Sequence, residues 1–457
     1  MLSMVHVGRK VYGFVLSFGL LVAASAPPPA AAVPAFTRQT GAPCSTCHTQ
    51  AFGPYLTPYG RNFKLHGYVD GAGDNPVPLV SGMFLGSFTH VDKPVPPGTE
   101  MPGYGAQDAF AFDQASLFLA GRLLPHLGLF TQLTYDGVGD TLALDNTEIR
   151  SNWETLLAGQ ELDFGVSATN APTVEDLWHT TPTWSYPSTA SPLAPTPAAG
   201  ALLDGALAGQ VGGALAYAQF AHLIYVEAGG YASFSKGVQR TLGTFDPGQD
   251  QIDGGAPYWR IALQWQTPTQ YFEIGHYGMT AEVFPGRVRD SGTDSVTDLA
   301  VDANYQYLGD NRNIVELRST YLREDRRNRA GLALGNDAVL DGTLDEFRLN
   351  GSYTFLQTYT ASVGYTNLWG SRDFLKFSPD PLGGSRTGKP DSEYFTFELG
   401  YVPFGKPGTG FGAWSNLRLG LQYTAYLKFN GAGNDYDGSG RNASDNDTLL
   451  LNCWLMF

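Results

Sequence analysis

Cysteine and charge are both scarce in this sequence. Its 457 residues include three cysteines, so the pair Cys44 and Cys47 has only Cys453 as a further thiol. Charged residues make up 16% of the chain while glycine numbers 56, which is poor in charge and rich in glycine for a soluble enzyme. The formal net charge of −15 argues against nucleic acid and anionic lipid head groups as partners. The same charge would suit cationic ligands at an exposed surface.

Long apolar runs are also missing, except near the N-terminus. Arg9 and Lys10 precede an apolar stretch, Val11 to Ala26, and Ala30 to Ala32 offer a small-residue cleavage site. This pattern predicts a secretory signal peptide over residues 1–32, because the apolar stretch is short for an uncleaved membrane anchor. No later stretch approaches about eighteen consecutive apolar residues, so we expect no transmembrane helix.

The residues Cys44-Ser45-Thr46-Cys47-His48 form a C-x-x-C-H motif, the attachment signature for c-type haem. We therefore predict that Cys44 and Cys47 hold one haem c covalently and that His48 is a ligand of its iron. The other interpretations are a thioredoxin-like dithiol, half of a zinc site and a simple disulfide. The dithiol lacks a βαβ context, and the zinc site lacks a second pair of ligands. Export fits the haem, because its attachment takes place outside the cytoplasm.

From Leu79 onward, apolar and polar residues alternate in segments of about ten residues, as in 259–265, 395–401 and 417–427. A period of two gives a strand one apolar and one polar face. In a soluble sandwich the apolar face would meet another sheet, whereas in an outer-membrane barrel it faces lipid. Sixteen candidate strands are centred near Phe84, Leu117, Leu129, Leu144, Leu162, Leu215, Tyr225, Leu263, Ile274, Asn304, Leu317, Tyr353, Val363, Phe397, Leu421 and Leu451.

The lengths of the connections favour the barrel over the sandwich. Long connections, such as 169–203 and 371–391, alternate with short ones, such as 221–222 and 357–358. The main exceptions are a short connection around Gly137 and a longer, glycine-rich one from 403 to 412. Long extracellular loops that alternate with short periplasmic turns are typical of outer-membrane barrels. We predict an all-β fold, an antiparallel outer-membrane barrel of about 16 strands.

Aromatic residues near the strand ends agree with a barrel. The chain ends on Phe457, and a terminal aromatic on the last strand is a common feature of outer-membrane barrels. Tyrosine and tryptophan near strand ends also suit the aromatic girdles at the two membrane interfaces. Seven residues are candidates for these girdles: Tyr258, Trp259, Tyr271, Trp369, Tyr394, Trp414 and Trp454.

The haem segment and the barrel must be fitted together. Residues 33–78 are too few for a conventional soluble cytochrome with a full core of its own. A barrel of this size, conversely, has an open lumen unless something fills it. We therefore expect three parts: a signal peptide (1–32), a monohaem cytochrome c-like plug inside the lumen (33–78) and a porin-like transmembrane barrel (79–457).

Three stretches around the motif carry a resemblance to a known family. Pro34 to Gly41 (PAFTRQTG), the CSTCH motif, and Tyr59 to Lys64 (YGRNFK) with Gly67-Tyr68 resemble the fused monohaem cytochrome–porins. The best-known members of that family are outer-membrane iron oxidases of iron-oxidising bacteria. Pro172 to Trp178 (PTVEDLW), in the longest loop, also resembles a family stretch. The barrel matches the family mainly in its pattern.

The resemblance implies a function and a location in the cell outer membrane. Extracellular Fe(II) would give one electron to the haem, which would pass it to a periplasmic cytochrome or similar carrier. The activity would be that of an Fe(II):cytochrome c oxidoreductase, with outer-membrane lipid around the barrel. Only the haem-binding residues Cys44, Cys47 and His48 carry over from the family, and no catalytic residue is identified.

The second axial ligand has four candidates: His66, Met83, His90 and Met101. A methionine there would raise the reduction potential, and a histidine would lower it. The sequence does not single out one site at which Fe(II) would enter. Acidic residues in the expected outer loops could attract Fe(II) or could simply keep the loops soluble: Asp246, Asp250, Asp253, Asp290, Asp294, Asp298, Asp435, Asp437, Asp445 and Asp447.

Two rival functions remain at this point. A diffusion porin with a structural haem would conduct ions and show little redox turnover. An extracellular electron-transfer porin with a different donor would differ only in what reduces it. An open pore gains nothing from a haem in its throat, so the plug argues against the first rival.

Overall fold

The computed structural model describes residues 34–71, 79–182, 185–409 and 414–457. The predicted signal peptide therefore lies outside the described residues. Most of the rest is strand, and the short helices lie before the first strand or in the connections. No helix within the described ranges is long and apolar enough to cross a membrane.

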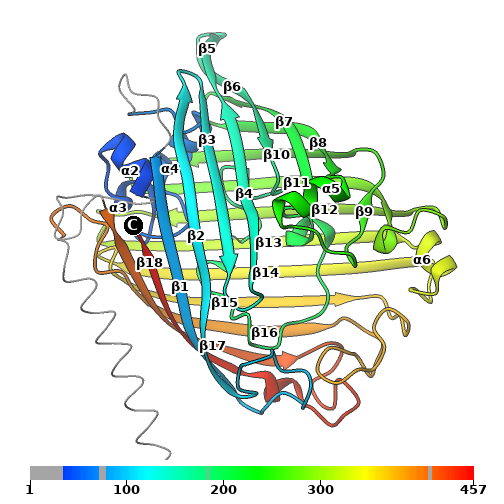
Figure 1. Cartoon of the computed structure of the whole chain (residues 1–457). Helices are drawn as coiled ribbons and strands as arrows, with labels where there is room; N and C mark the ends of the chain where they lie inside the picture. Colours follow the sequence, from blue (N-terminus) through cyan, green and yellow to red (C-terminus); the bar gives the residue numbers. More distant parts are fainter. Residues whose placement is uncertain (1–33, 72–78, 183–184, 410–413) are drawn as a thin grey trace, which may run out of the picture.

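The strands form one closed antiparallel barrel (Figure 1). Each strand pairs with its neighbours in the chain, and β1 pairs with β18 to close the ring. β4 and β5 make one interrupted strand of the wall, as do β9 and β10, so the wall has sixteen strands. The strands are β1 (Leu79–Val91), β2 (Asp108–Leu124), β3 (Leu127–Asp136), β4 (Thr141–Ser151), β5 (Trp153–Leu157), β6 (Gln160–Thr169), β7 (Val211–Phe220), β8 (Ile224–Ser233), β9 (Gln251–Ile252), β10 (Ala256–Gln266), β11 (Gln270–Phe284), β12 (Asp294–Tyr307), β13 (Asn313–Arg327), β14 (Asp341–Phe355), β15 (Tyr359–Gly370), β16 (Ser392–Tyr401), β17 (Asn416–Lys428) and β18 (Thr448–Met456). The predicted barrel is confirmed, and every predicted strand centre lies within one of these strands.

The two faces of the wall differ as the alternation predicted. Leu399 on β16 is 60% exposed, while its neighbour Glu398 is buried. On β17, Leu419 and Leu421 are exposed while Arg418 is buried inside. Successive side chains of a strand point to opposite faces, so the outside of the barrel is apolar and the inside is polar. An apolar exterior of this kind is typical of barrels that face lipid.

The predicted aromatic girdles are only partly correct. Trp369 and Trp414 are exposed, but Tyr258, Tyr271 and Trp454 are buried inside the barrel. Trp259 shares the outer face with Ile261, which requires its neighbour Tyr258 to point inward. The fourth inward residue, Tyr394, packs against Tyr426 with ring centroids 5.2 Å apart.

One end of the barrel carries short turns and the other carries long loops. The short-turn end includes two-residue hairpins in which both central residues have positive φ, as at Ala158 (52°) and Gly159 (77°). Such turns match the twist of paired strands. The long-loop end carries α5 (Lys236–Leu242), η3 (Pro285–Arg287), α6 (Arg329–Leu334) and η5 (Ala443–Asn446). The C-terminus lies at the short-turn end (Figure 1).

Two segments fill the interior. The N-terminal segment, residues 34–71, contains α2 (Pro34–Thr40), α3 (Cys44–Cys47) and α4 (Pro58–Leu65) and lies at the short-turn end (Figure 1). Thr57 caps α4 by accepting a hydrogen bond from the amide of Gly60, and Pro58 occupies the first turn, where no amide donor is needed. The inner loop, residues 170–210, joins β6 to β7 and contains η2 (Leu202–Ala206).

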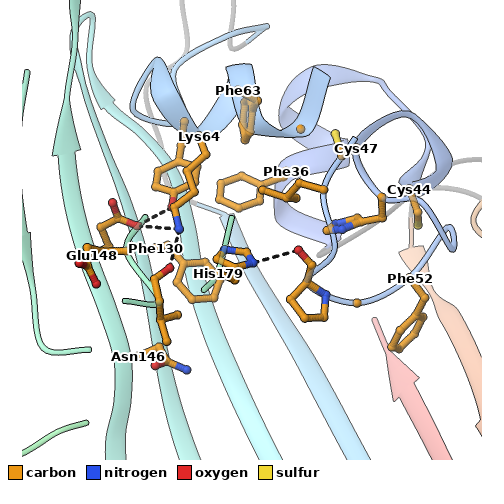
Figure 2. Close-up of a pocket in the computed structure, with 18 of the residues that line it drawn as sticks. Phe36, Cys44, Cys47, Phe52, Phe63, Lys64, Phe130, Asn146, Glu148 and His179 are labelled. Atoms are coloured by element: carbon orange, nitrogen blue, oxygen red, sulfur yellow. Dashed lines mark hydrogen bonds and ion pairs between the residues drawn. The ribbon is translucent and has the colours of Figure 1, made fainter. Parts of the chain in front are cut away.

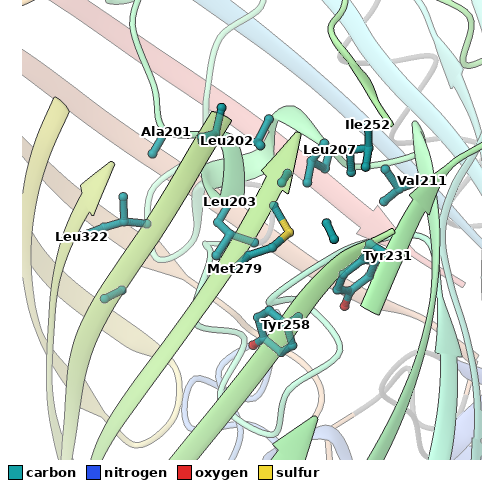
Figure 3. Packing of buried hydrophobic residues seen from close by; sticks show 14 of the residues in the cluster. Ala201, Leu202, Leu203, Leu207, Val211, Tyr231, Ile252, Tyr258, Met279 and Leu322 are labelled. Carbon is teal, nitrogen blue, oxygen red and sulfur yellow. The ribbon is translucent and has the colours of Figure 1, made fainter. Parts of the chain in front are cut away.

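The inner loop packs against the wall further toward the long-loop end. Leu202, Leu203 and Leu207 join a buried cluster with Met279 on β11 and other inward side chains (Figure 3). Glu324 and Asp298 on the wall accept hydrogen bonds from the amides of Leu202 (2.8 Å) and Leu203 (2.7 Å). The loop is thus held by wall side chains that satisfy its backbone.

Candidate haem site

Cys44, Cys47 and His48 line one cavity between the N-terminal segment, the inner loop and the barrel wall (Figure 2). The cavity is partly open to solvent, and most of its lining is apolar. A mostly apolar lining with a few polar groups is common in sites that bind cofactors.

Contacts from the barrel fix the motif. The amide of Ser45 donates to the carbonyl of Gly405 (3.0 Å), and Asn416 on β17 donates to the carbonyl of Ala51 (2.7 Å). The same Asn416 amide lies 3.1 Å from the Cys44 sulfur. Gly405 has φ of +79°, and a Cβ there would come within 2.9 Å of that sulfur. A side chain at Gly405 would therefore displace the thiol.

Aromatic rings make up much of the cavity lining. Phe36 stacks on Tyr68 with ring centroids 5.2 Å apart and meets Phe63 edge-on at 5.0 Å. Phe52 and Phe130 also line the cavity, the latter from β3 (Figure 2). Large flat apolar walls of this kind suit a flat apolar macrocycle and exclude water.

One side of the cavity is polar. Glu148 on β4 accepts a hydrogen bond from the Tyr68 hydroxyl (2.6 Å) and lies 3.6 Å from the Lys64 ammonium. Lys64 also donates to the carbonyl of Val174 in the inner loop (2.7 Å). These bonds join the N-terminal segment, the wall and the inner loop at one edge of the cavity.

Burial sets the protonation of the motif. It raises the pKa of Cys47 to about 12 and raises that of Cys44 as well. It lowers the pKa of His48 to about 4, so this imidazole is neutral, the form that ligates metals. Reactive dithiols and thiolate ligands instead have a lowered thiol pKa. The environment therefore does not favour a redox-active dithiol.

The zinc and disulfide interpretations gain no support from the described residues. Two groups of potential metal ligands occur there, His66 with Glu154 and Asp163, and His222 with Glu161 and Asp163. Neither includes Cys44 or Cys47, and these two cysteines form no disulfide within the described part of the chain.

One further observation about His48 agrees with a haem bound beside Cys44 and Cys47. The Nδ1 atom of His48 is buried and has no hydrogen-bond partner among the residues that the structure describes. A buried polar atom of this kind requires an explanation, such as a missing ligand. Haem attachment itself stays a prediction.

None of the four predicted candidates for the second axial ligand lines the cavity. His66 follows the last residue of α4, and its Nδ1 lies 3.0 Å from a carboxylate oxygen of Asp70. His90 pairs with Asp108 on the exposed face of β1 and β2. Met101 is 39% exposed in the β1–β2 connection. Met83 is buried in the cluster that contains Cys44, but it does not reach the cavity surface.

Two other potential ligands do line the cavity, His179 and Met456. His179 follows directly on the PTVEDLW stretch in the inner loop, and burial lowers its pKa well below the usual range. Its position one residue beyond that stretch is the signal that sequence reasoning overlooked. Met456 lies in the last strand, whose inward face could have been read from the alternation.

Several of the ten acidic residues have structural roles, and two of those predicted in loops, Asp294 and Asp298, lie in β12 instead. Asp294 accepts hydrogen bonds from the amides of Ala330 and Gly331, and Asp298 accepts one from the amide of Leu203. Asp437 accepts one from Leu382. The structure brings no three of the ten together as potential ligands among the residues it describes.

The barrel resembles solved outer-membrane proteins in fold. They include a Salmonella typhi OmpF complex with daunomycin (13% identity, TM-score 0.45, 83% of this chain and 97% of that one) and an anion-selective porin from Comamonas acidovorans (12%, 0.44, 83% and 98%). The outer membrane channel DcaP of Acinetobacter baumannii is similar at 9% identity and a TM-score of 0.44, over 83% of this chain and 96% of that one. No protein-family model matches the chain, and no match is found among curated proteins. The assignment of the fold rests on the strand pairing itself.

Proposed function

We propose that the chain is an outer-membrane electron conduit of the cytochrome–porin type. In this proposal Cys44 and Cys47 bind haem c covalently, His48 ligates its iron, and extracellular Fe(II) is the donor. The observation that supports it is the meeting of both thiols and the imidazole in one aromatic cavity inside a barrel with an apolar exterior. The short-turn end would face the periplasm, as in other outer-membrane barrels.

The bound haem would supply one-electron redox chemistry. The residues around it have distinct tasks. Asn416 and Gly405 hold the motif against the wall, and the rings of Phe36 and Phe63 keep water from one side of the cavity. The neutral imidazole of His48 provides the ligand atom. A soluble periplasmic carrier would take up the electron at the short-turn end.

The two segments inside the barrel disfavour a diffusion porin. Both the N-terminal segment and the inner loop contact the wall through buried hydrogen bonds: the Thr49 hydroxyl donates to Glu316, and the Thr189 amide donates to the side-chain oxygen of Gln422. The two segments therefore occupy part of the lumen through which solutes would have to pass.

The proposal is tested with the full-length protein in lipid vesicles. Fe(II) added on the long-loop side should convert the haem absorption bands to the reduced form within seconds, and a soluble cytochrome on the opposite side should then be reduced. His48→Ala should abolish both steps, whereas the matched change His222→Ala, at an exposed turn, should leave them unchanged.

Three results would contradict the proposal in different ways. Haem that stays oxidised with Fe(II) but is reduced by another donor would remove iron from it and keep the conduit. Large solute conductance without redox turnover would instead identify a porin. Reduction of the haem that survives His48→Ala would remove His48 as the ligand.

A further inference from the structure

His179 occupies the same cavity as the C-x-x-C-H motif although it lies far from it in the sequence. It belongs to the inner loop and lies among the cavity-lining side chains labelled in Figure 2. Its ring is deep in the protein but keeps accessible surface, and the space next to it is the cavity. The fold thus brings a second imidazole to the space that contains His48.

The two nitrogens of the His179 ring are in different situations. Nδ1 lies 2.9 Å from the carbonyl oxygen of Pro54, so it carries the proton and donates it. Nε2 then has a free lone pair and makes no hydrogen bond or ion pair within the described part of the chain. Histidines that ligate metals usually donate their other ring N–H to a backbone carbonyl or carboxylate in this way.

The backbone around His179 is held rigidly. Asp176 accepts hydrogen bonds from the amide of Trp178 (2.7 Å) and from the hydroxyl of Thr180. Arg318 on β13 donates to the carbonyl of Trp178 (2.6 Å). His179 itself has φ of +50°, in the left-handed region that few non-glycine residues adopt. Backbone in this conformation persists only where the surroundings impose it.

Met456 is the rival ligand in the cavity. It packs in an apolar cluster with Phe52, Met83 and Trp454, and this packing alone accounts for a buried thioether. Packing gives no role to an imidazole that lines the cavity while its second nitrogen makes no hydrogen bond within the described part of the chain. His179 is therefore the better candidate.

We propose that His179 Nε2 is the second axial ligand of the haem held by Cys44, Cys47 and His48, an inference that rests on the proposed function. The iron would be coordinated by two histidines. Bis-histidine coordination gives a lower reduction potential than coordination by histidine and methionine. The N-terminal segment would supply one ligand and the inner loop the other, so the haem would join the two segments.

The experiment is spectroscopy of the purified full-length holoprotein. The wild type should show a low-spin ferric electron paramagnetic resonance signal and the near-infrared magnetic circular dichroism band of bis-histidine haem. His179→Ala should lose the low-spin signal, and added free imidazole should restore it. His179→Met should raise the reduction potential. Met456→Leu and His66→Gln are the matched controls, and both should keep the wild-type spectrum.

The outcomes separate this inference from the proposed function. A wild-type band of the histidine–methionine type, or a low-spin signal lost in Met456→Leu and kept in His179→Ala, would overturn the assignment and leave the conduit intact. A wild-type protein without covalent haem would overturn both. If His179→Ala fails to fold, a wild-type band of the histidine–methionine type would still overturn the assignment, and a raised potential in His179→Met would still support it.

Discussion

The two segments inside the barrel are held alike but packed differently. Side chains from the barrel's connections reach the backbone of both, as Gln357 does at the carbonyl of Ser45 and Asn430 does at the amide of Ala198. The inner loop packs in the apolar cluster around Leu203 (Figure 3) and also borders a polar cavity against β14 to β18. The cavity beside the two thiols is lined mainly by apolar and aromatic side chains, which suit a flat apolar macrocycle. The N-terminal segment thus carries the thiols, and the inner loop adds His179 to the same cavity.

The sharpest test of this difference removes the chemistry and keeps the fold. The double change Cys44→Ala and Cys47→Ala should abolish covalent haem completely, because no thioether can form, while the folded barrel keeps its mobility on unheated gels. Haem staining of denaturing gels measures the attachment. Cys453→Ala, a half-buried thiol on the last strand, is the control and should retain all the haem. Covalent haem in the double variant would refute the role of the motif.

A second test breaks the support of the inner loop. Arg260 on β10 is buried and bonds Glu273 (3.0 Å) and Asp302 (2.8 Å), and it lies 3.8 Å from Asp176 in the loop. Arg260→Met should lower the free energy of unfolding by about 3–5 kcal/mol, because it leaves buried carboxylates without a cation.

Urea unfolding in detergent, followed by tryptophan fluorescence, measures this loss. The control is Arg323→Met, which removes an exposed arginine paired with Asp325 and should cost about 0–1 kcal/mol. Equal stability of the two variants would mean that the buried cluster does not hold the loop.

The smallest effect is expected from pH at the N-terminal segment. Burial of His66 opposes its charge, but the hydrogen bond to Asp70 and the charges of Asp163 and Glu154 raise its pKa overall. Because the pKa of His66 is raised in the folded state, protonated His66 stabilises the folded state. This stabilisation is fully present below pH 6.5, the ordinary histidine value, and is lost as the pH rises through the raised pKa.

Because Asp70 and Glu154 are exposed, the gain is about 0–1 kcal/mol after solvent screening. Hydrogen exchange of the 66–70 backbone amides should therefore speed up as the pH rises, beyond the intrinsic increase. His66→Gln should remove this extra dependence. An unchanged pH dependence in that variant would show that the His66–Asp70 pair contributes nothing.

The barrel could be predicted because a strand has a period of two. Alternation at positions such as Arg418 and Leu419 fixed which side chains point inward, and every strand centre was located correctly. The same rule would have corrected the aromatic girdles. Tyr258 and Trp259 are adjacent, so they could not both face lipid.

The cavity was harder to predict because distant parts of the chain form it. The C-x-x-C-H motif is local and readable, but its surroundings come from β17, β18 and the inner loop. Nothing in the sequence near His48 indicates that His179 shares its cavity. The candidates chosen from sequence were close in the chain, and the fold placed them elsewhere. Pairings of this kind depend on how a long loop folds back, which no local pattern encodes.

The ring of contacts around the N-terminal segment has a consequence for biogenesis. Its partners run from Glu148 on β4 through Gln306 on β12 to Asn416 on β17, and β1 closes the ring against β18. The wall surrounds the segment laterally, so once the last seam has formed the segment could enter only through the short-turn end. Attachment of the proposed haem to Cys44 and Cys47 on the extended chain, before the barrel closes, would avoid that passage. Maturation of the thiols would then precede membrane insertion.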